Sequence, residues 1–178
     1  MYERPYPDEP AGPFPSPPIE FTDRADRDIV VRPYDPAGPE KEALVEMYVA
    51  FDPTDRAQGI PPTRESQIRS WLDTILDEGL NVIAWDDDRA AGHATLVPQG
   101  DAYELAIFVL QEYQEAGIGT HLIEGLLGYG AEEGAEKVWL TVERWNTPAV
   151  NLYEKIGFEV SNSESFELEM SLRLAPED

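Results

Sequence analysis

A glycine-containing turn between two apolar segments constrains this chain more than any other feature. The turn, Gln114-Glu115-Ala116-Gly117-Ile118-Gly119, follows the apolar segment 103–110 and opens a stretch whose apolar residues recur with helical spacing. Free amides at a helix N-terminus favour anions, and glycines keep side chains from blocking the approach. The pattern therefore predicts a strand, a turn and a helix that hold a diphosphate on backbone amides.

The same pattern also fits an ordinary strand-to-helix turn that binds nothing. Two other nucleotide-binding motifs are disfavoured by residues that this chain lacks. A Rossmann turn would need a third glycine at position 122, where Leu122 stands, and no Walker lysine follows the turn.

A second informative segment covers residues 146–158, with the sequence NTPAVNLYEKIGF. Thr147 and Pro148 predict an N-cap and a first-turn proline, and Gly157 predicts the end of the helix. Tyr153 falls on the apolar side of this helix, where a core tyrosine is the plainest interpretation of the periodicity. The asparagine that precedes Thr147 fits a loop residue bonded to local backbone.

Hydrophobic periodicity and turn residues predict the remaining elements. The expected strands are 28–34, 80–85, 91–97, 103–110, 137–142, one that begins at Phe158, and 165–174, and the expected helices are 38–51, 63–79, one from the glycine turn to Gly134, and 147–157. The strand 103–110 is apolar on both faces except at Glu104, which places it in the middle of a sheet. The order predicts an α/β (α+β) domain with helices packed on a mixed sheet.

The turn and the second segment together resemble the acetyl-CoA-binding core of the GNAT family of N-acetyltransferases. The family motif is Gln or Arg, two variable residues, Gly, one variable residue, then Gly or Ala, and Gln114, Gly117 and Gly119 match it. The element order over about residues 28–174 is similar as well. The resemblance implies a mostly antiparallel central sheet of about seven strands with helices on both faces.

The resemblance also implies a cosubstrate, acetyl-CoA, and a set of residues that bind it. Its pyrophosphate would lie on the turn amides, and its pantetheine arm would pair with a bulged strand that splays from its neighbour. The implied cofactor-binding residues are Ile107, Phe108, Val109, Gln114, Glu115, Ala116, Gly117, Ile118, Gly119, Thr120, Asn146 and Tyr153. By the same resemblance, Tyr153 is the general acid that protonates the departing CoA thiolate.

Transfer to nitrogen requires a neutral amine, and deprotonating an alkylamine at pH 7 costs about 4 kcal/mol. Glu104 is the candidate base, because it is the lone charge in the central strand and many family members carry a carboxylate there; a solvated carboxylate at the sheet rim is the alternative. Members that modify ribosomal protein termini carry a glutamate where this chain has Thr141, and Glu143 is only a displaced substitute. His121 is better explained by packing than by catalysis.

The net charge of -23 excludes some partners and needs an explanation. Such a charge repels nucleic acid and anionic membranes. The acidic residues are dispersed over the chain, so we favour adaptation to a salt-rich cytoplasm, as in a halophilic organism, over a surface that attracts a cationic amine. The chain has no cysteine and two histidines, and we expect no disulfide and no metal site. Without a signal-like start or a long apolar run, a cytoplasmic protein is expected.

Residues 1–27 are expected to form a proline-rich extended arm, either disordered or laid along a surface, because seven prolines fall within the first eighteen positions. Residues 28–178 would be the acetyl-CoA-binding domain. By resemblance, acceptor specificity lies in residues 48–70. The polar residues there fit a pocket for a cationic amine or, as we prefer, an ordinary solvated surface; they are Asp52, Asp55, Arg56 and Glu65.

The sequence therefore favours an N-acetyltransferase that moves the acetyl group of acetyl-CoA directly to a primary amine of a small molecule or protein. No covalent intermediate is expected. A non-catalytic acyl-CoA-binding regulatory module is the alternative, and the threonine at position 141 is compatible with it. A third interpretation is an interaction protein whose acidic face and arm dock a partner. A homodimer is one of the assemblies we consider.

Overall fold

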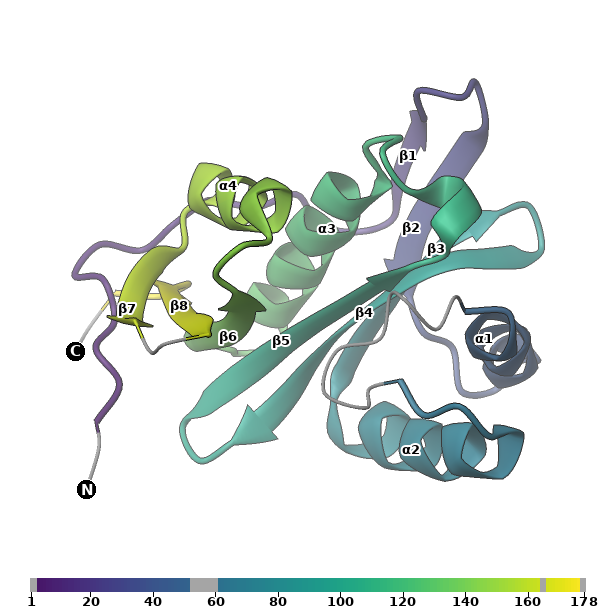
Figure 1. Cartoon of the computed structure of the whole chain (residues 1–178), viewed down its shortest axis with the longest axis horizontal. Coiled ribbons are helices and arrows are strands. Elements are labelled where there is room, and N and C mark those ends of the chain that lie inside the picture. Colours follow the sequence, from purple (N-terminus) through teal and green to yellow (C-terminus); the bar gives the residue numbers. More distant parts are fainter. Residues whose placement is uncertain (1–2, 52–60, 164–165, 177–178) are drawn as a thin grey trace.

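The computed structural model describes residues 3–51, 61–163 and 166–176. The strands are β1 (Ile19–Thr22), β2 (Asp28–Pro33), β3 (Leu80–Asp86), β4 (Arg89–Gln99), β5 (Ala102–Val109), β6 (Lys137–Glu143), β7 (Glu159–Ser163) and β8 (Glu167–Arg173). The helices are α1 (Glu40–Val49), α2 (Glu65–Glu78), α3 (Ile118–Glu132) and α4 (Thr147–Ile156), with a short 3-10 helix at Gln111–Tyr113. Figure 1 shows their arrangement.

The described strands form one sheet in the order β1-β2-β3-β4-β5-β6-β8-β7. Neighbours are antiparallel except β5 and β6, which are parallel. The predicted mixed, mostly antiparallel sheet is confirmed, and β5 lies in its middle as expected. The described residues contain eight strands rather than about seven, because residues 19–22 pair with β2 inside the segment expected to be an arm.

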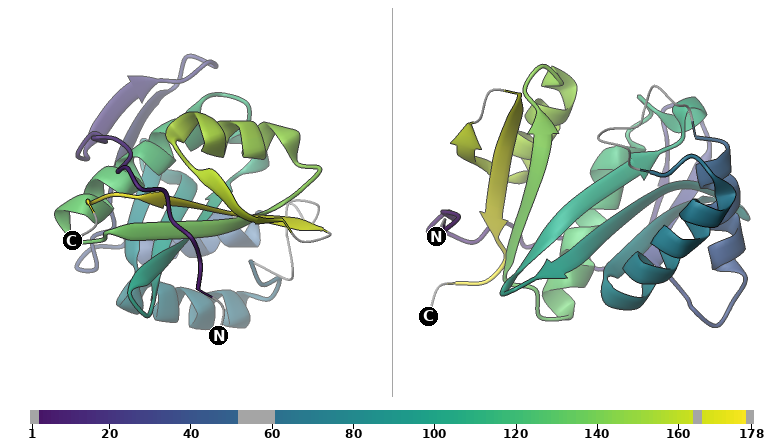
Figure 2. Two further views of the ribbon diagram at one scale, coloured as in Figure 1. Left: turned by 90° about the vertical axis from the view of Figure 1, so that its left-hand side faces the viewer. Right: turned by 60° about the horizontal axis from the view of Figure 1, so that its bottom comes forward.

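Helices cover both faces of the sheet, with α1 and α2 on one side and α3 and α4 on the other (Figure 2). Leu44 of α1 and Ile68 of α2 are fully buried on the first side, and Leu122 and Leu126 of α3 are fully buried on the second. Each such side chain stabilises the fold by about 1.5–3 kcal/mol relative to an exposed one. The apolar layers on the two faces of the sheet enclose β5 and hold this central strand in place.

Helix ends are where the structure departs most from the sequence-based expectation. Asn146, not Thr147, is the N-cap of α4: its side-chain oxygen accepts a hydrogen bond from the amide of Ala149 at 3.4 Å. Helix α2 begins at Glu65, two residues after Thr63, and its N-cap makes no side-chain hydrogen bond. Boundaries of this kind are set by tertiary packing as much as by cap residues.

The first residues of the described chain lie along the surface of the C-terminal strands and α3. The amide of Ala11 donates to the carbonyl of Arg173 at 2.7 Å, and farther on a Cβ at Gly128 of α3 would lie 2.0 Å from the carbonyl oxygen of Pro15. Figure 2 (left) shows this segment passing from the side of α2, around the edge of the sheet, to the side of α3. The expected boundary between arm and domain at residue 27 stays a prediction.

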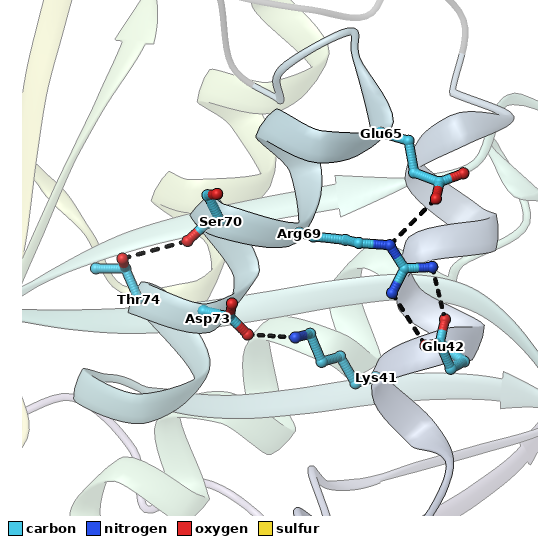
Figure 3. Close-up of polar contacts among 7 residues, drawn as sticks. All are labelled: Lys41, Glu42, Glu65, Arg69, Ser70, Asp73 and Thr74. Carbon is cyan, nitrogen blue, oxygen red and sulfur yellow. Dashed lines mark hydrogen bonds and ion pairs between the residues drawn. The ribbon is translucent and has the colours of Figure 1, made fainter.

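An ion-pair network joins α1 and α2 on their outer surface (Figure 3). The guanidinium of Arg69 bonds both carboxylate oxygens of Glu42 at 3.0 Å and one oxygen of Glu65 at 3.1 Å. Lys41 pairs with Asp73 beside it. The carboxylate of Glu65 is thus exposed and neutralised by its own helix, which supports the solvated interpretation over a role in an acceptor pocket.

Candidate functional site

The central sheet splits between β5 and β6. These two strands pair through Tyr103 with Val138 and Glu104 with Trp139, whereas β6 and β8 pair along the whole of β6. Beyond Glu104 the strands diverge, and Figure 2 (right) shows the wedge between them. The divergence leaves the last residues of β5, including Ile107 and Phe108, without a neighbouring strand on that side.

The predicted splay is therefore present, but the predicted bulge is not. The register of β4 against β5 runs without a shift from Gly92 opposite Val109 to Gln99 opposite Ala102. The gap opens because β6 diverges from β5. It does not require the extra residue that a β-bulge would insert into β5.

The glycine turn lies between β5 and α3. Gly117 is the N-cap of α3, with a φ of 91°, and Glu115 also has a positive φ, of 60°. Successive amides in such a turn, together with the unpaired first amides of the helix, form a concave anion site. A Cβ at Gly117 would meet nothing within 4 Å, and one at Gly119 would only reach ordinary contact with Ile107 and Leu152. Neither glycine is therefore required by close packing against other parts of the described protein.

Gln114, the first residue of the motif, ties the turn to β5. Its side-chain amide donates to the carbonyl of Val109 at 2.9 Å. Two consequences follow: the turn is held beside the end of the strand, and the Val109 carbonyl already has a protein donor. We therefore expect Gln114 to position the turn rather than to contact the cofactor through its side chain.

His121 packs against the N-terminal strand. Its ring stacks on that of Phe21 with centroids 3.7 Å apart, and its Nδ1 lies 2.9 Å from the carbonyl oxygen of Gly117. A carbonyl accepts, so Nδ1 carries the proton. These contacts give His121 the packing role that the sequence favoured.

Arginines from the β1–β2 loop lie close to the turn, although the chain as a whole is strongly acidic. The amide of Arg24 donates to the carbonyl of Ala116 at 3.1 Å, and its guanidinium donates to that of Glu115 at 3.4 Å. Arg27 is neutralised by Asp23, but within the described chain Arg24 makes no ion pair. Its charge adds to the helix dipole in attracting an anion. The sequence analysis missed this residue, because it lies 91 positions from its contact.

Tyr153 lies on α4, which covers the same face of the sheet as α3. It is 8% exposed and packs edge-on against Phe158, with ring centroids 5.9 Å apart. Burial raises the pKa of Tyr153 to about 12. The neighbouring Leu152 lies next to Gly119, so α4 and the glycine turn meet at the open edge of β5.

Glu104 lies on the opposite face of the sheet from Tyr153. It has the same strand parity as Phe108, whose ring packs edge-on against Trp71 of α2, whereas Ile107 faces the glycine turn. Burial raises the pKa of Glu104, and the positive charge of Arg4 opposes that rise. The structure thus places Glu104 on the face covered by α1 and α2, and the helix that carries Tyr153 on the other face.

Residues outside the predicted set surround Glu104. The ring of Trp139 stands beside it across the parallel pair, and Glu169 of β8 lies directly opposite Thr141. The guanidinium of Arg4 lies 3.6 Å from the Trp139 ring centroid and 2.8 Å from a Glu169 oxygen. These contacts join residues far apart in the chain, and no local motif marked them.

On the same side, an aromatic cluster lines the region expected to set acceptor specificity. Tyr48, Phe51 and Trp71 contact one another or Phe108, with centroids 5.1–6.2 Å apart. Three residues proposed for an acceptor pocket lie outside the described residues; they are Asp52, Asp55 and Arg56.

Comparison with protein families decides the classification. The model of the acetyltransferase (GNAT) family matches residues 41–158. The chain belongs to this family. The match includes both the glycine turn and α4, which are the segments that carried the resemblance.

Curated GNAT-type relatives match part of this chain. It is 38% identical over 78 residues to an N-alpha-acetyltransferase of Sulfurisphaera tokodaii, covering 43% of this chain and 46% of that protein. It is 31% identical over 137 residues to a mycothiol acetyltransferase of Saccharomonospora viridis, covering 68% of this chain and 43% of that protein. The chain thus matches about half or less of the length of these relatives.

Solved GNAT structures share the fold. The GNAT domain of S. lividans PAT superposes with a TM-score of 0.72 at 16% identity, over 88% of this chain and 96% of that one. The acetyltransferase yncA from Salmonella typhimurium, solved with acetyl-CoA, gives 0.69 at 18% identity, over 84% and 96%. These similarities confirm the predicted fold class.

Two further observations concern membrane-spanning helices and metal-binding groups. In the described part of the chain, no helix is long and apolar enough to cross a bilayer. Nor do the residues that the structure describes contain a group of three or more His, Cys, Asp or Glu arranged to hold a metal ion.

Proposed function

We propose that this protein is an N-acetyltransferase that transfers the acetyl group of acetyl-CoA directly to a primary amine. The observation that carries the proposal is the glycine turn: a side chain at Gly117 would meet no other atom within 4 Å, and the turn lies beside the edge where β5 has lost its neighbouring strand. An anion site beside unpaired strand edges suits a diphosphate followed by an amide-containing arm, which would pair with β5 as an added strand.

Acetyl-CoA supplies an acetyl thioester, whose transfer to an amine forms an amide and releases the CoA thiol. Backbone groups of Ile107 and Phe108 would orient the arm, and the amides of residues 115–120 would hold the pyrophosphate. Asn146 caps α4 through its side chain, so we assign it the positioning of that helix. Its proposed contact with the cofactor is a second, separate role.

Tyr153 would donate a hydrogen bond to the sulfur as negative charge develops on it. Burial keeps the hydroxyl protonated across the working pH range, since its pKa is about 12. A thiol has a pKa of about 8.5, so complete proton transfer from Tyr153 to a thiolate is unfavourable. We therefore assign Tyr153 stabilisation of the leaving group, with solvent completing the protonation.

Glu104 would accept the proton of the acceptor ammonium, directly or through water. Its half-buried position raises its pKa above the usual value of a glutamate, which makes the carboxylate a stronger base. Because Glu104 and Tyr153 lie on opposite faces, the amine would enter from the side of α1 and α2 and the thioester from the side of α3 and α4. The reacting groups would meet in the wedge.

The proposal also concerns the cellular environment in which the protein works. We place the protein in a salt-rich cytoplasm, because 36 acidic residues stand against 13 basic ones and are dispersed along the chain. At molar salt the screening length is about 3 Å, which suppresses their repulsion of each other and of an anionic cosubstrate.

The test compares wild-type protein with Tyr153→Phe across a panel of primary amines, with release of the CoA thiol as the readout. We expect turnover with at least one amine and a loss of about a hundred-fold or more in kcat in the variant. Calorimetry should show unchanged affinity for acetyl-CoA. Undiminished turnover in Tyr153→Phe would remove this residue from the mechanism.

The second candidate is a non-catalytic acyl-CoA-binding regulatory module. Thr141, at the position where some family members carry a glutamate, favours it. Acetyl-CoA binding without turnover on any amine of the panel would support the module and contradict the enzyme.

A further inference from the structure

The N-terminal segment places a cation on the acceptor side of the split sheet. The guanidinium of Arg4 stacks over the indole of Trp139 at 3.6 Å, and its Nε lies 2.8 Å from Glu169 Oε1. The backbone beside it is also held, because the hydroxyl of Ser171 donates to the carbonyl of Pro5 at 2.9 Å. A stacked and ion-paired guanidinium is the geometry by which proteins recognise this group.

The site that receives Arg4 is built from side chains of β6, β7 and β8. The second oxygen of Glu169 accepts a hydrogen bond from Ser161 at 3.0 Å, which fixes the carboxylate beneath the guanidinium. Trp139 is 8% exposed, and its buried indole N–H finds no hydrogen-bond partner within the described chain. Leaving a buried donor unpaired costs about 1–3 kcal/mol, so an acceptor atom that reached this N–H would be bound favourably.

The same site adjoins the proposed reaction centre. Trp139 and Glu104 are partners in the last pair before β5 and β6 diverge, and paired residues point to the same face. The charge of Arg4 acts on Glu104 across this pair. A cation bound on Trp139 therefore lies beside the carboxylate that would receive the proton of the acceptor amine.

We propose that Trp139, Glu169 and Glu104 form a cation subsite of the acceptor site, that Arg4 occupies it in the free protein, and that the acceptor is an amine carrying a guanidinium group. The guanidinium would displace Arg4, stack on Trp139 and pair with Glu169, leaving the primary amine of the same molecule near Glu104. This inference rests on the proposed function.

Arg4 then acts as an internal competitor. A tethered group has an effective concentration of about millimolar, so every acceptor that uses the subsite must compete with Arg4, and its apparent affinity is lowered. Specificity follows, because a monoamine gains nothing from the subsite and cannot displace the guanidinium. Removal of the Arg4 side chain should open the subsite without altering Trp139 or Glu169.

Calorimetric titration with agmatine, which carries one primary amine and one guanidinium, tests the proposal in the absence of acetyl-CoA. We expect Arg4→Ala to bind agmatine at least tenfold more tightly than wild-type protein. Butylamine, which lacks the guanidinium, should bind neither protein measurably. Arg89→Ala is the matched control and should behave as wild type, because Arg89 is likewise paired with a glutamate, Glu112, and likewise lies over an aromatic ring, that of Tyr113.

The double variants Arg4→Ala/Glu169→Gln and Arg4→Ala/Trp139→Leu should lose the gained affinity, and the isosteric glutamine variant serves where the tryptophan variant fails to fold. Equal affinity of wild-type protein and Arg4→Ala for agmatine, or affinity retained in the glutamine double variant, overturns the subsite. Because no acetyl transfer is measured, the result is independent of the proposed activity. Loss of acetyl-CoA binding would overturn the function and leave the cation subsite standing.

Discussion

Glu104 and Trp139 face each other in the last residue pair before the central sheet divides. Up to that pair, β5 and β6 are hydrogen-bonded as parallel neighbours. Beyond it the two strands diverge, and the gap between them is the proposed binding cleft. The candidate base and the stacking platform for Arg4 thus stand together at the vertex of the wedge. This placement links acceptor recognition and proton transfer in one small region.

The pH dependence of activity should report the pKa of Glu104 and the effect of Arg4 on that pKa. Burial raises the pKa of Glu104, so kcat/KM should fall as the pH decreases through that raised value, where the base becomes protonated. Because Arg4 opposes the rise, Arg4→Gln should move the acidic limb of the profile to higher pH. Glu104→Gln should abolish that limb. A profile unaffected by both substitutions would exclude Glu104 as the base.

Arg24 should contribute to cofactor affinity through its charge. Arg24→Gln removes a cation beside the carbonyl of Glu115 without touching the glycines. For an exposed charge we expect acetyl-CoA affinity to fall about two- to fivefold at low salt, and the difference to vanish at molar salt. Calorimetry at both salt concentrations measures this. A difference that persists at molar salt would show that the loss is structural rather than electrostatic.

A buried polar chain behind the acceptor site should make the fold sensitive to acid. The hydroxyl of Tyr48 lies 2.6 Å from Nδ1 of His93, whose Nε2 lies 2.7 Å from the side-chain oxygen of Asn81. Asn81 donates its own amide to the carbonyl of Ile75. His93 therefore carries its proton on Nε2 and accepts from Tyr48, as a neutral ring.

Burial lowers the pKa of His93 to about 3. The unfolded chain binds a proton below about pH 6.5 and the folded chain does not, so the free energy of unfolding should fall by about 1.4 kcal/mol per pH unit between these values. Urea unfolding from pH 7 to pH 5 should show this slope in wild-type protein, and His93→Gln should lack this part of it. Identical slopes in the two proteins would contradict a neutral buried His93.

The sequence predicted the elements well where local patterns determine them. Gly134 and Gly157 have the positive φ expected at helix ends, and the central strand was recognised by its apolar faces around Glu104. The strand at residues 19–22 was missed because a short edge strand depends on β2, not on its own sequence. The N-cap at Asn146 was assigned one residue too late for a similar reason.

The candidate site was predictable only in part. The glycine turn and Tyr153 lie in motifs of consecutive residues, so a single sequence displays them. Arg4 and Glu169 are 165 positions apart in the sequence, and no local sequence pattern indicates that they form an ion pair. The cation subsite needed the structure, because it exists only where the arm, β6 and β8 meet.

The central claim is that the amides around Gly117 hold acetyl-CoA, and titration of acetyl-CoA in molar KCl tests it most directly. Wild-type protein should bind with a dissociation constant in the range of about 1 μM to 1 mM. Gly117→Trp should lose that binding. The matched control is Gly100→Trp in the β4–β5 turn, because Gly100 also has a positive φ, of 63°, and also faces open space; it should bind as wild type does. Failure of folded wild-type protein to bind, or equal binding by folded Gly117→Trp, would contradict the account.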